Sequence, residues 1–217
     1  VALPPAQDHK PVGDGDTGPN TGGMGAWSPF AGCPADLADD VLDRFVEPTL
    51  AALRDRGIDY RGALYAGLML TPDGPRLIEY NVRFGDPDSQ PVLLRMTSDL
   101  AGLLAAAADG DLAAVGSPTF SDDAVVLVVA ASEGYPASPR TGDVIEGLDA
   151  ARAVEGVDVL CAGVTTDDDG RLVTAGGRVL GVVGRAPTAA EARDRAYRAL
   201  GEISWPGLHH RTDIAAG

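Results

Sequence analysis

The run Ala124–Ala131 constrains this chain most, because it places eight apolar residues in succession, four of them valine. A continuous apolar run of this length, rich in β-branched residues, predicts a strand that is buried on both faces. It is the longest unbroken apolar run in the sequence and is far below the roughly 20 residues that cross a bilayer as a helix. The sequence therefore indicates a globular chain built around buried strands, with no membrane partner.

The rest of the pattern predicts an α+β chain of two regions, 1–116 and 117–217. Residues 1–35 are rich in Gly, Pro, Asp, Asn and Thr, which is typical of irregular structure. The apolar spacing that follows predicts a helix with a break at Pro48, then a β-hairpin and a second helix, at 36–57, 63–82 and 99–108. We thus expect an antiparallel sheet with helices in the first region.

The second region is predicted to be rich in strands, with one late helix. Besides Ala124–Ala131, strand-like segments lie at 159–165, 172–174 and 178–184. Thr188 is a suitable N-cap for a helix that extends to about Ile203, with alanines and leucines on one face. This region is therefore expected to form a small β-rich domain.

Charge and cysteine content exclude several classes of protein. The 217 residues carry 17 Lys and Arg against 32 Asp and Glu, a net charge of −15. Binding to a nucleic-acid backbone or an anionic membrane requires a basic face, so neither partner is expected. Cys33 and Cys161 are the only cysteines and are far apart, which fits a reducing cytoplasm and offers no zinc site.

A glycine-rich segment, Asp14–Gly25, is the first candidate site, with five glycines between residues 15 and 25. It formally contains GxGxxG, but no strand precedes it and Pro19 prevents a helix from starting there, so a dinucleotide fingerprint is rejected. Such glycines let the backbone approach a ligand closely, with N–H groups directed at anionic oxygens. A glycine-rich turn or a flexible linker is the alternative interpretation.

Three polar side chains alternate along the predicted strand Leu77–Val82 and just beyond it. Glu79, Asn81 and Arg83 should share one face, because successive strand residues point to opposite sides. A carboxylate and an amide oxygen suit a hard cation such as Mg²⁺, and a guanidinium suits phosphate. The alternative is an ordinary solvated face on a half-buried strand.

The following segment, Phe84–Pro91, has two prolines and a glycine and is expected to form a rigid loop. Asp86 and Asp88 could accept hydrogen bonds from an amine, although a simple turn or helix entrance is equally consistent. No motif for a protein nucleophile is present. His9 could contact an anion, but an exposed loop histidine is the simpler interpretation.

These segments resemble the phosphoribosylamine–glycine ligase (glycinamide ribonucleotide synthetase) family of the ATP-grasp superfamily. The resemblance covers essentially the whole chain, and the segments that carry it are Gln7–Lys10, Gly13–Asp14, Asp16–Ala26, Glu79–Pro91, Ser132–Pro136, Gly176–Leu180 and Arg211–Ile214. It implies that residues 1–116 are the C-terminal half of an ATP-grasp domain and that 117–217 are the ligase's C-terminal domain.

The resemblance also implies an enzyme of purine biosynthesis, with glycine, 5-phosphoribosylamine and ATP as substrates. Glu79 and Asn81 would hold Mg²⁺ or Mn²⁺ on the triphosphate, and Arg83 would be catalytic by stabilising phosphoryl charge. The cation would also reconcile an acidic chain with an anionic nucleotide. The substrate-binding residues implied are Asp16, Thr17, Gly18, Pro19, Asn20, Thr21, Gly22, Gly23, Met24, Gly25 and Asp86.

The chain departs from the family pattern in three ways. The signature usually has Glu where this chain has Asp88, and Ala63–Leu70 lacks the further acidic ligand that many ATP-grasp relatives carry. The family's N-terminal half, with part of the nucleotide site, is not in the sequence, so the isolated chain is expected to have little activity. A related carboxylate–amine ligase and a non-catalytic nucleotide-binding module remain as alternatives.

Overall fold

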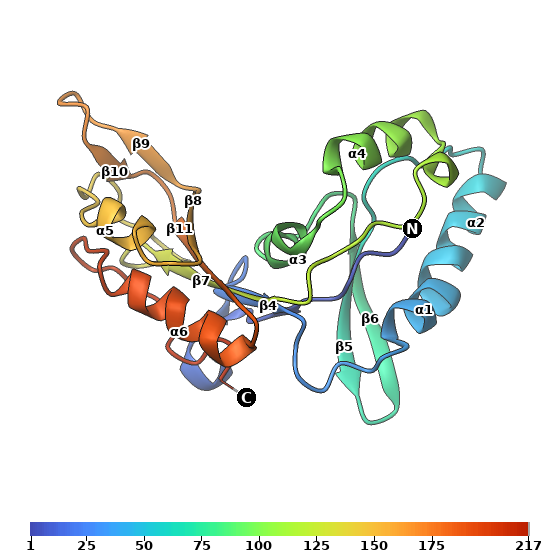
Figure 1. Ribbon diagram of the computed structural model, residues 1–217, viewed down its shortest axis with the longest axis horizontal. Coiled ribbons are helices and arrows are strands. Elements are labelled where there is room, and N and C mark those ends of the chain that lie inside the picture. Colours follow the sequence, from blue (N-terminus) through green and yellow to red (C-terminus); the bar gives the residue numbers. More distant parts are fainter. Residues whose placement is uncertain (217) are drawn as a thin grey trace. The chain divides into compact units, whose positions relative to one another are not determined.

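The computed structural model describes residues 1–216, whose contacts define two compact units (Figure 1). Unit 1 comprises Val1–Pro5, Gly32–Gly85 and Met96–Ser121, and unit 2 comprises Ala6–Ala31, Asp86–Arg95 and the chain from Asp122 onward. The units interleave along the sequence because a strand near the N-terminus pairs with the buried strand at 124–131. The sequence division at residue 117 stays a prediction.

Unit 1 contains a helical segment, a β-hairpin and a second helix, as the sequence predicted. Its elements are α1 (Leu37–Val41), the π-helical turn η2 (Leu42–Val46), α2 (Glu47–Asp55), β5 (Tyr65–Thr71), β6 (Gly74–Asn81), α4 (Leu100–Asp109) and the 3-10 turn η3 (Leu112–Ala114). The predicted break at Pro48 takes the form of the π-turn just before it, since proline has no N–H and crowds the carbonyl four residues earlier. Asp99 caps α4 by accepting a hydrogen bond from the Ala101 N–H at 3.0 Å.

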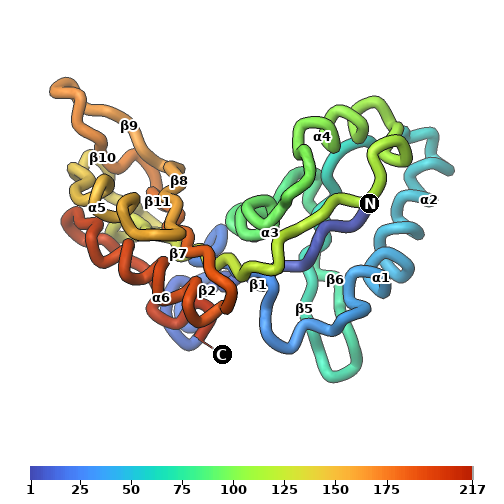
Figure 2. Tube along the Cα trace, in the orientation of Figure 1, coloured from blue at the N-terminus to red at the C-terminus, as the bar shows by residue number. Residues whose placement is uncertain are grey.

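Unit 2 is built on a five-stranded antiparallel sheet in the order β1-β4-β7-β11-β8. The strands are β1 (Gln7–Asp8), β4 (Gly25–Ser28), β7 (Ala124–Ala131), β11 (Arg178–Ala186) and β8 (Val157–Cys161). Every residue of β7 is buried, as its unbroken apolar run predicted. In Figure 2 the blue N-terminal segment runs beside the yellow-green β7, the pairing that places residues 6–31 in this unit.

Helix α6 (Ala189–Leu200) packs on this sheet through small side chains. Ala192, Ala196 and Ala199 are fully buried, and Gly184 of β11 lets the helix approach, since a Cβ there would lie 2.0 Å from the Ala192 carbonyl oxygen. Thr188 caps the helix as predicted, accepting from the Glu191 N–H at 3.3 Å. The helix and sheet thus enclose the main core of the unit.

Shorter elements complete unit 2 and account for two differences from the prediction. They are β2 (Pro11–Gly13) paired with β3 (Thr17–Asn20), the 3-10 turn η1 (Asp14–Asp16), α3 (Ser89–Arg95), α5 (Leu148–Arg152), and β9 (Val164–Thr166) paired with β10 (Leu172–Thr174). Residues 1–35, expected to be irregular, hold four short strands whose partners supply the order that their composition does not. The expected strand 159–165 is divided between β8 and β9, which join different sheets.

Over residues 1–216, helices are too short or too polar to traverse a lipid bilayer.

Candidate functional site

In unit 1, Glu79 and Asn81 lie on one face of β6, as strand alternation predicted, and together they form the polar row. The Asn81 side-chain amide donates to Glu79 Oε1 at 2.9 Å, so the two side chains project to the same side. The pairing of β6 with β5 is regular from Glu79 to Asn81, so simple alternation places both on one face, and a bulge at Ile78 lies just before them. The Glu79 carboxylate and the Asn81 amide therefore lie side by side on an open face of the strand.

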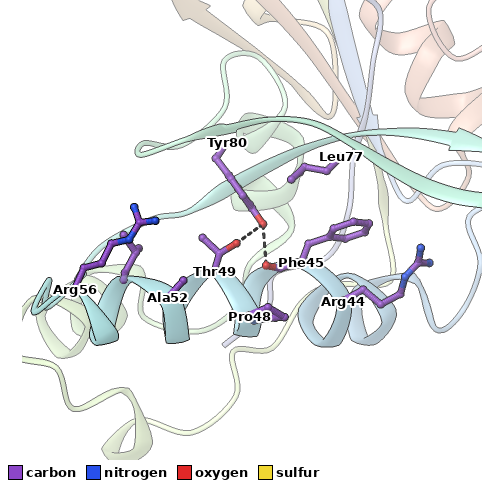
Figure 3. A pocket seen from close by; sticks show the side chains of 9 residues that line it. Arg44, Phe45, Pro48, Thr49, Ala52, Arg56, Leu77 and Tyr80 are labelled. Carbon is purple, nitrogen blue, oxygen red and sulfur yellow. Dashed lines mark hydrogen bonds between the residues drawn. The ribbon is translucent and has the colours of Figure 1, made fainter.

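The opposite face of β6 is anchored to the helical segment, and Figure 3 shows the contacts. The Tyr80 hydroxyl donates to the Phe45 carbonyl oxygen at 2.8 Å and lies 2.9 Å from the Thr49 hydroxyl. Leu77 lies on the same side and helps to line a pocket of about 350 Å³. Because Tyr80 stands between Glu79 and Asn81, these bonds fix the strand that carries the polar row.

Two apolar residues near Leu77 and Tyr80 in the sequence do not share their partly buried face. Ile78 and Val82 are 65% and 76% exposed, whereas Leu77 and Tyr80 are partly buried. The bulge turns Ile78 away from the face that carries Leu77 and Tyr80, and Val82 lies beyond the end of β6.

Arg83 follows β6 and is exposed. Its Nη1 donates to the Phe84 carbonyl oxygen at 2.8 Å, which draws the guanidinium back along its own backbone. The side chain retains further N–H donors for an anionic ligand.

The first half of the glycine-rich segment in unit 2 forms the exposed β2–β3 hairpin. All four residues of β3, Thr17–Asn20, are exposed. Asp16 is an ion-pair partner of Arg211, whose Nη1 lies 2.8 Å from Asp16 Oδ1 and whose side chain is only 1% exposed. Asp213 also pairs with Arg211 at 2.7 Å, and this contact holds the pKa of Asp213 well below its usual range. The turn is thereby tied to the C-terminal segment.

The second half of the segment, Thr21–Gly25, runs from the surface into the core. The Thr21 N–H and hydroxyl both donate to the Lys10 carbonyl oxygen at 2.8 Å. The Gly23 N–H donates to the Thr21 hydroxyl at 2.9 Å. Met24 is fully buried, and Gly25 is buried in β4. Gly22 and Gly23 are therefore the last residues before the chain enters the sheet.

Gly22, Asp86 and two residues from the later part of the chain meet in unit 2. The Gly22 N–H donates to the Tyr135 hydroxyl at 3.0 Å. Arg178 donates to the Asp86 carbonyl oxygen at 2.8 Å and to its carboxylate at 3.1 Å, and a Cβ on Gly22 would lie 2.8 Å from the Arg178 Cζ. Tyr135 and Arg178 lie in segments that carried the family resemblance, but no spacing rule identified them as site residues.

The side chains that could bind a metal ion do not cluster in the described residues. Across residues 1–216, no three His, Cys, Asp or Glu side chains converge in a way that could hold a metal ion. Glu79 and Asn81 therefore stand as a two-ligand surface.

Comparison with known proteins identifies the class and then the family. Residues 1–89 match the model for the phosphoribosylglycinamide synthetase ATP-grasp (A) domain, and residues 125–217 match that for the C domain of the same synthetase. The first match makes this an ATP-grasp protein. Because both models describe consecutive domains of one enzyme, the chain belongs to the phosphoribosylglycinamide synthetase family.

Individual relatives agree with this assignment. The chain is 52% identical over 216 residues to the phosphoribosylamine–glycine ligase of Streptomyces coelicolor, covering 99% of this chain and 52% of that protein. It is 48% identical to the chloroplastic phosphoribosylamine–glycine ligase of Arabidopsis thaliana, covering 41% of that protein. The chain thus spans about half the length of the curated relatives it matches.

Solved structures show the same fold. The crystal structure of phosphoribosylamine–glycine ligase from Thermotoga maritima superposes with a TM-score of 0.85 at 36% identity, covering 98% of this chain and 51% of that one. The N5-carboxyaminoimidazole ribonucleotide synthetase of Thermotoga maritima, at 16% identity and a TM-score of 0.55, shares the fold alone, covering 84% of this chain and 46% of that one.

Proposed function

We propose that the protein containing this chain joins glycine to 5-phosphoribosylamine with ATP, giving glycinamide ribonucleotide, ADP and phosphate. The observation that carries this proposal is the identity of about half of all residues to phosphoribosylamine–glycine ligases over nearly the whole chain. The fold of the chain also matches that of the Thermotoga maritima ligase, with a TM-score of 0.85.

The reaction requires two displacements. A glycine carboxylate oxygen attacks the γ-phosphorus of ATP, the bond to the β–γ bridging oxygen breaks, and glycyl phosphate and ADP form. The phosphoribosylamine nitrogen then attacks the glycyl carbonyl carbon, phosphate leaves and the amine loses a proton. Such chemistry depends on positioning and on stabilising phosphoryl charge rather than on a protein nucleophile.

Residues of this chain suit those tasks. Arg83, whose N–H donors are exposed, is proposed to stabilise phosphoryl charge. The segment Asp16–Gly25 and Asp86 are proposed to bind glycine and phosphoribosylamine. Within that segment the meeting of Gly22 with Asp86 and Arg178 is the geometry that most favours a binding role, since it combines backbone, carboxylate and guanidinium groups.

A divalent cation fits the polar row of β6. Glu79 and Asn81 offer hard oxygens from one strand face, and Mg²⁺ commonly takes only one or two protein ligands, with nucleotide phosphates and water completing its shell. This agrees with a two-ligand surface, and Mn²⁺ suits the same donors. When bound, such a cation neutralises charge on the triphosphate.

We also propose that the protein works in the cytoplasm, because Cys33 and Cys161 are both free thiols, as a reducing compartment favours.

The test uses the natural protein that contains this chain. We expect ADP release that depends on both glycine and phosphoribosylamine, with other amino acids much poorer. Equal rates with several amino acids would instead indicate a different carboxylate–amine ligase, and no turnover would indicate a binding module. The chain alone should release little ADP, because it spans about half of its relatives' length.

The metal proposal has its own matched pair of variants. Glu79→Gln keeps the size of the side chain but removes its charge, and should lower kcat at least about 100-fold and raise the Mg²⁺ concentration needed for half-maximal rate. Glu155→Gln makes the same change at an exposed position of unit 2 and should leave both values unchanged. Unaltered turnover in Glu79→Gln would remove Glu79 from the metal site.

A further inference from the structure

Two carboxyl groups, Asp8 of β1 and Asp88 just before α3, are buried together in unit 2. The Asp8 side chain is 9% exposed and Asp88 is 7% exposed. Asp8 pairs with the Lys10 ammonium group. Among residues 1–216, however, no N–H or O–H group donates to Asp8 Oδ1 or Asp88 Oδ1, although both atoms are buried. Neither oxygen belongs to the machinery assigned above.

Asp8 Oδ1 and the ring of Pro87, the residue before Asp88, both lie within 2.7 Å of one Cβ position built on Gly23, so Asp8 lies against the turn that carries Asp88. A hydrogen bond between two carboxyl groups requires one of them to carry a proton. Burial, and then the charge and hydrogen bond of Asp88, raise the pKa of Asp8 to about 7, while Lys10 acts in the opposite direction. Two ionised carboxylates in this position would repel each other without solvent to screen them. A single proton held by Asp8 and donated to Asp88 would remove this repulsion and satisfy an oxygen of each group.

The pair lies directly against Gly23. A Cβ on Gly23 would lie 2.7 Å from Asp8 Oδ1 and 2.3 Å from Cδ of Pro87, the neighbour of Asp88. The adjacent Gly22 lies against Arg178, which holds Asp86. The carboxyl pair therefore joins β1 to the Asp86–Asp88 turn at the point where both meet the Gly22–Gly23 segment.

We propose that Asp8 and Asp88 share one proton, and that this proton holds the Gly22–Gly23 segment against the Asp86–Asp88 turn, which makes both aspartates positioning residues for substrate binding. The inference about substrate binding rests on the proposed function, whereas the shared proton does not. Loss of the proton leaves two buried negative charges that push the turn and β1 apart.

Neighbouring titratable and charged groups do not replace that proton. Lys10 supplies one positive charge for two carboxyls, and Arg178 is already paired with Asp86. Burial, and then Arg211, lower the pKa of His9, so its ring is neutral at neutral pH and adds no positive charge.

The first experiment measures hydrogen–deuterium exchange of the peptide covering residues 17–25 in the natural protein containing this chain. From about pH 6 to about pH 8, exchange corrected for its intrinsic rate should rise about tenfold in the wild type. Asp8→Asn cannot lose the proton, and its amide can still donate to Asp88, so its corrected exchange should stay flat. Asp88→Glu retains an acid and should keep the rise. A flat wild-type profile, or a rise unchanged in Asp8→Asn, overturns the shared proton.

The second experiment measures kcat and KM for glycine over the same pH range. Wild-type kcat/KM should fall about tenfold per pH unit above the pKa of Asp8, about 7, through KM rather than kcat, and Asp8→Asn should abolish that fall. Asp168→Asn, at an exposed turn, should behave as the wild type. An unchanged profile in Asp8→Asn overturns the positioning role. A protein that shows the exchange effect but has no ligase activity refutes the proposed function and leaves the shared proton intact.

Discussion

Replacing Gly23 with alanine tests the close contact between the glycine-rich segment and the Asp86–Asp88 turn. Gly23 has φ +123°, a conformation that costs an L-residue about 1–3 kcal/mol. Its new Cβ would lie 2.3 Å from Pro87 Cδ, about 1 Å closer than ordinary van der Waals contact. Because the proline ring is rigid, we expect a further cost of about 1–3 kcal/mol from overpacking. The total expected loss of unfolding free energy is about 4 kcal/mol.

Gly142→Ala is the matched control in the same unit. Gly142 has φ +91°, and no heavy atom lies within 4 Å of a Cβ built there, so only the backbone cost applies, about 2 kcal/mol. Urea unfolding of the full chain, followed by the fluorescence of the buried Trp27 and Trp205, gives both values. Equal losses in the two variants would show that Gly23 does not lie against Pro87 and Asp8 as described.

Three further changes probe other contacts by the same unfolding measurement or by hydrogen exchange. Between about pH 4 and pH 7 the folded chain holds a proton on Asp8 that the unfolded chain has lost. The unfolding free energy should therefore fall as pH rises, by up to about 1.4 kcal/mol per pH unit. Asp8→Asn should abolish this slope, and an identical slope in the variant would contradict the assignment. Arg211→Met removes the cation from Asp213, which is partly buried, and from Asp16, which stays solvated, so we expect a loss of about 2 kcal/mol, mostly through Asp213; a loss below about 0.5 kcal/mol would mean that the pairs are not stabilising. Tyr80→Phe removes the bond to the Phe45 carbonyl oxygen and should speed exchange in β6 about fivefold, from a loss of about 1 kcal/mol; unchanged exchange would refute the anchoring role.

Local patterns in the sequence determined much of the fold. The buried strand at Ala124–Ala131, the hairpin that carries Glu79 and Asn81, and the cap at Thr188 all follow from periodicity or from residues adjacent in the chain. These features could be predicted because the interactions that specify them are local. The shared face of Glu79 and Asn81 follows for the same reason.

Only the tertiary structure decided what the irregular N-terminal residues become. β1 and β4 carry little strand signal of their own, and they are ordered by pairing, β4 with β7 nearly 100 residues later in the chain. The approach of Arg178 and Tyr135 to Gly22 spans still longer separations, so no spacing rule could reveal it. The same holds for the burial of Asp8 beside Asp88. The sequence by itself determined the family and most of the elements after residue 35, whereas long-range packing decided the N-terminal strands and which charged groups are removed from water together, because burial depends on residues far apart in the chain.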